Sequence, residues 1–274
     1  MRLTMRKTIL LCLLLQCTLV LAGGRGLAAD FRFVTLEFPP LEYENDRQEA
    51  EGGVVEIVRT VMAQLGHDVD IRVLPWTRAM QMVAGGKADA IFTAYRNSER
   101  EKFLEYSEEV LFDQEIYFYK KKGSPVDFDG YIASIRDARI GIVSTISYGQ
   151  EFDRYRQFIR LDKANQLAHN FGKLVKGRID LLPSSYYVAE STIQQMGVAA
   201  QVERLPQMIE SLPSFIAFSR KRDLHGVRLA FDDQLKTLKS TGEYEQILRK
   251  HGLILPFGDP SAESGKEKGQ QPGP

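Results

Sequence analysis

The chain has 274 residues, of which 36 are Lys or Arg, 36 are Asp or Glu, and 43% are hydrophobic. This composition is typical of a soluble globular protein and excludes collagen-like, mucin-like and wholly disordered chains. The formal net charge of zero favours neither a nucleic-acid partner nor an anionic membrane surface, and we expect neither. The length suits one large domain or two smaller ones.

The first 29 residues have the layout of a secretory signal peptide. They carry four bases and no acid, and an almost wholly apolar run covers residues 9–22. That run is shorter than the roughly 20 apolar residues that a membrane span needs, so an uncleaved anchor is the less favoured alternative. We expect cleavage after Ala29, with cleavage after Gly24 as the second choice, and a periplasmic product.

Both cysteines, Cys12 and Cys17, lie in this leader. The mature chain is therefore expected to have no disulfide and no Cys-based metal site. The four histidines lack the spacing of a metal site, and no nucleophile elbow or phosphate-binding glycine motif occurs. We accordingly expect no metal, no cofactor and no enzymatic activity.

Short apolar strands alternate with amphipathic helices along the rest of the chain. The apolar patterns predict strands at residues 31–36, 70–74, 89–93, 115–120, 139–143, 179–182 and 215–219. They predict helices at residues 53–65, 76–84, 147 onward, 163–175, 187–195, 224–241 and 243–251. The βαβαβ order at the start indicates an α/β domain with parallel pairing, and a second α/β series follows it. Residues 258–274 are rich in Gly, Pro, Ser, Lys and Glu and are expected to be a disordered tail.

Seven sequence stretches occur in a fixed order between residues 30 and 256. They are FPPLEY at 38–43, GGVVEIV at 52–58, WTRAMQMVAGGKADAIF at 76–92, SEREKFLEYSEEVL at 98–111, RIGIVSTISYG at 139–149, KGRIDLLPSS at 176–185 and TGEYEQILRKHG at 241–252. Together they resemble the family-3 extracellular solute-binding proteins, which are the polar-amino-acid receptors of ABC importers. The resemblance covers nearly the whole mature chain.

The resemblance implies a periplasmic-binding-protein-like α/β fold of two lobes, with a central ligand cleft and two hinge crossovers. Lobe 1 would comprise residues 30–115 and 216–257, and lobe 2 would comprise residues 116–215. It implies a monomer that captures a small polar, carboxylate-bearing solute by hinge closure and delivers it to an inner-membrane ABC permease. Two alternatives remain open, namely the ligand-binding input of a membrane sensor and a dehydratase-type enzyme on the same fold.

The sequence Ser98-Glu99-Arg100-Glu101 marks a candidate ligand clamp. Ser98 and Glu101 form a capping-box pattern that would place Arg100 in the first turn of a helix, where a guanidinium can hold a carboxylate through two parallel hydrogen bonds. In the family, the arginine of this motif binds the α-carboxylate of the ligand. The alternative is a surface ion pair with Glu99 or Glu101. Arg96 is either a second cation at the cleft or a solvated loop residue.

The turn that contains Thr145 and Ser147 lies between a predicted strand and a predicted helix. A helix N-terminus presents free N–H groups to an anion. The resemblance matches Ser147 with the hydroxyl residue that meets the ligand carboxylate, while the alternative is that Ser147 only caps its own helix. Thr145 stands where the family usually has glycine.

The remaining candidates are aromatic walls and a possible ammonium site. Phe38, Tyr43, Trp76 and Tyr95 are expected to line the cleft, and packing in the core is the alternative for Trp76. In the family's α-amino-acid receptors, the position of Ser185 carries an Asp that holds the ammonium. An unpaired ammonium in a closed cleft is costly. Either another acid, with Glu37 as the candidate, replaces that Asp, or the ligand is not a standard α-amino acid.

Overall fold

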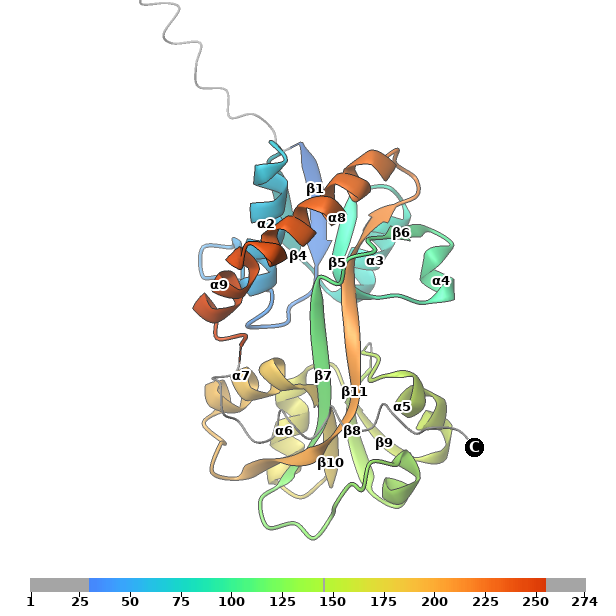
Figure 1. The fold of residues 1–274 in the computed structure, drawn as a ribbon. Coiled ribbons are helices and arrows are strands. Elements are labelled where there is room, and N and C mark those ends of the chain that lie inside the picture. Colours follow the sequence, from blue (N-terminus) through green and yellow to red (C-terminus); the bar gives the residue numbers. More distant parts are fainter. Residues whose placement is uncertain (1–29, 145, 255–274) are drawn as a thin grey trace, which may run out of the picture.

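The structure is a computed structural model that describes residues 30–144 and 146–254. Figure 1 shows two lobes, each with a β-sheet and helices packed against it, joined by two long strands. These strands are β7 (Phe112–Lys121) and β11 (Val202–Ser219), which pair antiparallel with each other. This architecture confirms the predicted α/β fold with two lobes and two crossovers.

Three of the predicted features lie outside the described residues: the signal peptide at 1–29, the residue Thr145 and the tail at 258–274. In the part of the chain that is described, no helix combines the length and the apolar character needed to cross a membrane. The sequence boundaries of the two lobes remain a prediction.

The sheet of the first lobe has the strand order β4-β1-β5-β11, with β6 pairing to the end of β11. Parallel pairing joins β1 to both β4 and β5. The strands are β1 (Phe31–Thr35), β4 (Val69–Val73), β5 (Ala90–Tyr95) and β6 (Leu104–Tyr106), beside a small hairpin of β2 (Tyr43–Glu44) and β3 (Ala50–Glu51). The helices are α2 (Gly53–Gln64), α3 (Trp76–Ala84), α4 (Ser98–Glu101), α8 (His225–Ser240) and α9 (Glu243–Lys250).

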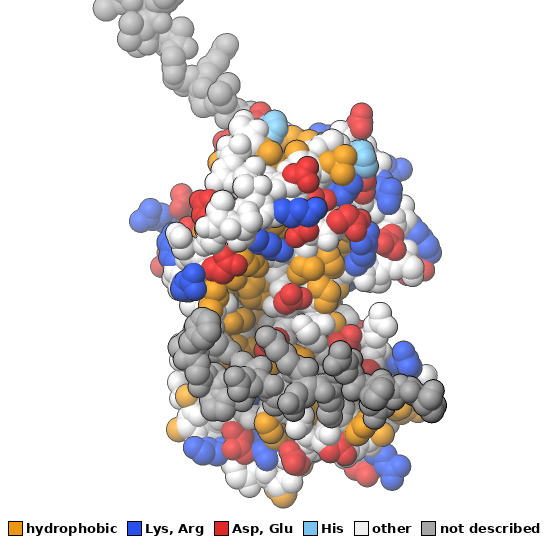
Figure 2. Space-filling model, viewed as in Figure 1, with side chains coloured by type: hydrophobic (Ala, Val, Ile, Leu, Met, Phe, Trp, Pro, Cys, Tyr) orange, Lys and Arg blue, Asp and Glu red, His pale blue; other side chains and the backbone are white. Residues whose placement is uncertain are grey.

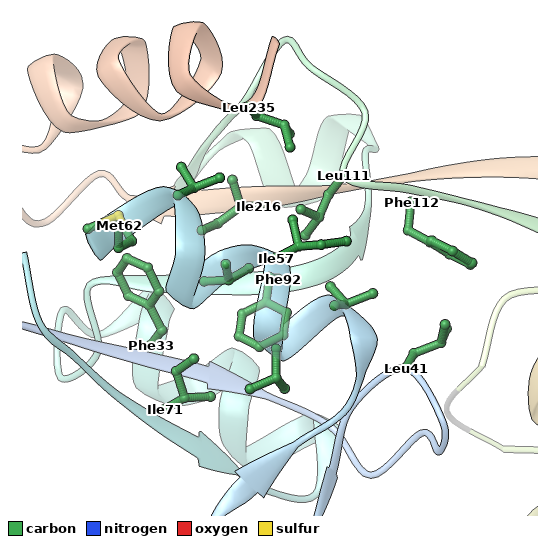
Figure 3. Packing of buried hydrophobic residues seen from close by; sticks show 14 of the residues in the cluster. Phe33, Leu41, Ile57, Met62, Ile71, Phe92, Leu111, Phe112, Ile216 and Leu235 are labelled. Carbon is green, nitrogen blue, oxygen red and sulfur yellow. The ribbon is translucent and has the colours of Figure 1, made fainter. Parts of the chain in front are cut away.

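The core of the first lobe explains why α2 forms where its apolar stripe predicts it. Figure 3 shows Ile57 and Met62 of α2 pointing toward Phe33 of β1 and Phe92 of β5, and all four side chains are fully buried. Burying each such side chain contributes about 1.5–3 kcal/mol. This packing fixes β1 and β5 side by side, so that the loops after both strands open at the same edge of the sheet.

The sheet of the second lobe continues from the crossover strands in the order β7-β10-β8-β9. β8 pairs parallel with both β10 and β9. Its strands are β8 (Arg139–Val143), β9 (Arg160–Ala164) and β10 (Leu181–Ser185), and its helices are α5 (Gln150–Tyr155), α6 (Leu167–Val175) and α7 (Tyr186–Met196). Two 3-10 turns, Ile132–Ile135 and Arg156–Phe158, complete the lobe.

One sequence prediction is wrong in this lobe, and one predicted strand is confirmed but too short. The helix expected at 163–175 begins at Leu167, because residues 160–164 form the edge strand β9. Its sequence RLDKA has no fully buried residue and thus lacks a readable strand pattern. The strand expected at 215–219 is only the end of β11, which spans 18 residues. Pro206 concealed that strand, and a register shift between Arg204 and Met208 accommodates it in the pairing with β7.

Candidate functional site

A pocket of about 380 Å³ lies where the two lobes meet. The first lobe lines it with Leu36, Phe38, Trp76, Thr93, Tyr95 and Arg100. The crossover strand β7 contributes Gln114, and the second lobe contributes Ile146 and Ser147. A neighbouring pocket of about 280 Å³ shares three of the residues that line the first pocket: Phe38, Tyr95 and Ile146. We call the two together the cleft pocket.

The cleft pocket lies at the carboxyl ends of strands from both lobes. Leu36 follows β1, Tyr95 ends β5, Val143 ends β8 and Ser185 ends β10, and all four line the cleft pocket. Ligands of open α/β sheets bind at this edge because the loops that follow parallel strands gather there. On the face shown in Figure 2, hydrophobic side chains gather at the waist between the lobes, where the outline is indented.

Arg100 reaches the pocket from the one-turn helix α4. The backbone N–H of Arg100 donates to Asn97 Oδ1 at 3.0 Å, so Asn97 caps this turn and the predicted cap at Ser98 is wrong. The guanidinium stacks over Trp76 at 5.1 Å, and Nη1 donates to the carbonyl oxygen of Tyr95 at 2.9 Å. These contacts fix the orientation of the guanidinium, and its other N–H groups remain available to donate to a carboxylate.

The acids next to Arg100 in the sequence do not neutralise it. Glu99 pairs with Lys102 and Glu101 pairs with Arg96, and within the described ranges no carboxylate forms an ion pair with Arg100. Arg96 also pairs with Glu108 at 3.1 Å, is exposed, and does not line the cleft pocket. The structure therefore brings Arg100 to the pocket and leaves Arg96 in a surface ion-pair network.

Ser147 lines the pocket from the opposite lobe. Its hydroxyl donates to Asp153 Oδ2, and Asp153 is held in turn by an ion pair of 2.7 Å with Arg156. Gly149, rather than Ser147, is the N-cap of α5. Gly149 has a φ of 107°, a backbone conformation that strains any residue with a Cβ, and a Cβ there would also require the side chain of Glu210 on β11 to move.

Tyr148 is a site residue that the sequence analysis missed. Its hydroxyl accepts the backbone N–H of Val143 at 2.8 Å, and its ring is buried in the second lobe. Burial raises the pKa of the Tyr148 phenol, which keeps it neutral. The bond ties the turn after β8 to the end of that strand.

Two residues of the cleft-pocket lining have a buried polar atom without a hydrogen-bond partner among the described residues: Gln114 with Oε1 and Ser185 with Oγ. Such atoms are rare because burial without a partner costs about 1–3 kcal/mol. Gln114 was also missed by the sequence analysis, although a signal exists. It occupies the inward position of β7 between buried Phe112 and Ile116, where the pattern calls for an apolar residue.

Glu37, which precedes the FPPLEY segment, and Glu42 within it both lie outside the pocket lining. Glu37 is exposed, and its Oε2 accepts the backbone N–H of Glu44 at 3.1 Å. Glu42 is fully buried, and Thr93 Oγ1 donates to its Oε2 at 3.0 Å. Burial raises the pKa of the Glu42 carboxyl well above its usual range and favours the uncharged acid. Thr93, which separates Glu42 from the pocket, has an unusual φ of 58°.

The lining thus combines one fixed cation with aromatic walls and neutral polar groups. Phe38, Trp76 and Tyr95 supply the aromatic walls, whereas Tyr43 does not line the pocket and its hydroxyl donates to Glu51 at 3.0 Å. Burial raises the pKa of the Tyr95 phenol, so this group is neutral as well. Among residues 30–144 and 146–254, no group of three or more His, Cys, Asp or Glu side chains could hold a metal ion. The arrangement can hold a small anion, with contacts from both lobes.

Comparisons with known proteins agree with this architecture. The family model of the bacterial extracellular solute-binding proteins, family 3, matches residues 33–253. No protein in a comparison with curated sequences matches significantly. An ancestral arginine-binding protein bound to arginine has a similar fold, with a TM-score of 0.68 at 20% identity over 80% of this chain and 96% of that one.

Two further solved structures share the fold at low identity. One is a histidine kinase sensor domain with similarity to periplasmic binding proteins, at a TM-score of 0.70 and 16% identity, covering 83% of this chain and 99% of that one. The other is an ancestral amino acid-binding protein described as a precursor of cyclohexadienyl dehydratase, at a TM-score of 0.67 and 16% identity, covering 80% and 94%. The family match spans most of the sequence, and the chain therefore belongs to the bacterial extracellular solute-binding proteins of family 3.

Proposed function

We propose that this protein captures a small carboxylate-bearing solute, an amino acid or a related compound, by closing its two lobes on it. The observation that carries the proposal is that Arg100 of the first lobe and Ser147 of the second line one pocket. A ligand whose carboxylate is held by Arg100 and which also contacts Ser147 links the lobes. It therefore favours the closed arrangement over the open one.

The crossover strands support hinge closure. Of the described residues, β7 and β11 connect the two sheets, and Gln114 of β7 lies in the pocket lining. Small backbone rotations in two adjacent strands can move one lobe relative to the other without breaking either core. In this proposal the protein is a periplasmic monomer, exported by a cleaved signal peptide, that passes its ligand to the permease of an ABC importer.

The family match favours a binding protein over an enzyme. The sensor and dehydratase alternatives remain, because the proteins of similar fold include a histidine kinase sensor domain and an ancestral precursor of cyclohexadienyl dehydratase. An enzyme would convert the bound compound, whereas a receptor returns it unchanged. Recovery of each bound compound after incubation, analysed by mass spectrometry, separates these cases.

The first experiment is a thermal-shift screen of the chain from Asp30 onward, unfolded and refolded so that any co-purified ligand is removed. The panel contains amino acids, dicarboxylates, aliphatic and aromatic monocarboxylates, opines, amines and small peptides. A ligand at 100 times its dissociation constant stabilises the fold by about 2.7 kcal/mol. We expect shifts from carboxylates and none from their neutral amides. Stabilisation by amines alone, or by no compound, would contradict the proposal.

A further inference from the structure

The charges around the cleft pocket are unbalanced. Of the described residues that line either part of the pocket, Arg100 alone is charged, and none is an acid. A carboxylate bound at Arg100 is therefore matched by one cation. A second ligand charge of either sign finds no counter-ion in the lining.

The acids nearest to the pocket do not supply a negative charge. Glu42 lies behind Thr93, is fully buried, and favours its uncharged form. Glu37 is exposed and does not line the pocket. Asp153 touches the lining through the hydroxyl of Ser147, but its ion pair with Arg156 already neutralises it. An ammonium in the closed pocket would thus be desolvated without a charged partner, which is strongly unfavourable.

The second part of the pocket is apolar. Ile116, Val143, Tyr148 and Leu167 line it together with the residues that it shares with the first part. The polar side-chain groups of its described lining are the neutral phenols of Tyr95 and Tyr148 and the hydroxyls of Ser184 and Ser185, and Ser185 Oγ is buried without a described partner. These surroundings suit an apolar or aromatic ligand body that carries at most a neutral polar group toward Ser185.

We propose that the ligand is a monocarboxylate with an aromatic or branched aliphatic body and without an ammonium group. This inference rests on the proposed function, because it takes carboxylate capture at Arg100 as given. It deepens that function by naming the class of solute that the neutral lining accepts.

Matched pairs of compounds test the inference directly. 3-Phenylpropanoate and L-phenylalanine differ by one ammonium group, as do 4-methylpentanoate and L-leucine. Isothermal titration of the refolded chain should show each ammonium-free member binding at least tenfold more tightly than its amino acid. Equal or tighter binding of the amino acids would overturn the inference while leaving carboxylate capture intact. Failure of all four to bind, together with a screen in which no ammonium-free monocarboxylate shifts the melting temperature, would overturn the inference. If no carboxylate of any class shifts the melting temperature, the proposed function is overturned as well.

A substitution in the lining gives an independent test. Ser185 is the N-cap of α7 with extended backbone, a position where Asp is favoured, so Ser185→Asp should fold. The added carboxylate should shift the affinity ratio of each pair at least tenfold toward the amino acid, and the neutral control Ser185→Asn should not. Gln114→Glu, which is isosteric, is the second variant if Ser185→Asp unfolds. An unchanged ratio in a folded acidic variant would refute the inference.

Discussion

Removal of the Arg100 side chain is the sharpest test of the site. In the proposed complex, Arg100→Ala deletes the hydrogen-bonded partner of the ligand carboxylate inside a pocket closed by both lobes. Truncating one partner of such a buried charge pair costs about 2–5 kcal/mol. The dissociation constant of the best carboxylate in the screen should therefore rise about 30-fold to 4,000-fold.

The effect on stability should be smaller than the effect on binding. The side chain stacks over Trp76 and donates to the Tyr95 carbonyl, while the cap at Asn97 uses the Arg100 backbone and survives. Losing the stacking and one hydrogen bond costs about 1.5–2 kcal/mol. In a protein of this size, that corresponds to a fall in melting temperature of about 3–8 °C.

Arg96→Ala is the matched control. This arginine lies four positions earlier and pairs with Glu101 and Glu108 at the surface. Exposed ion pairs contribute about 0–1 kcal/mol to stability. Because Arg96 does not line the cleft pocket, its removal should change ligand affinity less than about threefold. Arg100→Lys should fall between the two, because an ammonium keeps the charge but lacks the planar fork. An affinity of Arg100→Ala within threefold of the parent protein, measured by titration calorimetry, would refute the assignment.

Three further predictions concern stability, measured by urea unfolding. Burial raises the pKa of Glu42 in the folded protein, so the stabilisation that the uncharged side chain provides is complete below about pH 4.5 and is lost as the pH rises. Relative to Glu42→Gln, the free energy of unfolding of the parent protein should fall by about 1.4 kcal/mol per pH unit until the folded pKa is reached. A difference between the two proteins that does not change with pH would contradict this prediction. Hydrogen bonds from Arg139 lower the pKa of Asp180 in the folded protein, so the charged carboxylate stabilises the fold at neutral pH. The parent protein should be more stable than Asp180→Asn at pH 7, and this difference should shrink as the pH falls below about 3.8. Gly149→Ala should lower the free energy of unfolding by about 1–3 kcal/mol, because the φ of 107° strains alanine and its Cβ would meet the side chain of Glu210 on β11. Gly226 lies in a helix with open space around it, so the control Gly226→Ala should leave the free energy of unfolding unchanged or raise it by up to about 1 kcal/mol. Equal effects of the two glycine substitutions would argue against the collision.

Local pattern was sufficient for much of the fold. The helix over Trp76–Ala84 and the strand over Arg139–Val143 have the bounds that the sequence predicted, because their apolar periodicity is complete within the segment. β9 and most of β11 could not be predicted in this way. The polar sequence of β9 and the part of β11 that contains Pro206 and Pro213 become strand only through pairing with β8 and β7.

For the candidate site, sequence motifs identified candidate residues, and the fold decided which of them line the pocket. The motifs pointed to Phe38, Trp76, Tyr95, Arg100 and Ser147, and the structure gathers these five residues around one pocket; their role in binding remains a prediction. Arg96 and Glu37 bore equally suggestive charges in the sequence, yet the fold places both outside the lining. Which of two neighbouring arginines faces the pocket depends on a single capped turn, and sequence spacing alone does not specify it.

The sequence by itself determined the alternation of strands and helices, the family resemblance and a short set of charged and aromatic candidates, because these depend on neighbours along the chain. Only the tertiary structure decided that Gln114 and Ser185 leave buried polar atoms at the pocket, and that no described acid lines it. Those properties arise where two lobes meet, between residues far apart in sequence. Burial, unpaired polar atoms and charge balance depend on contacts between the two lobes, and no single segment of the sequence determines them.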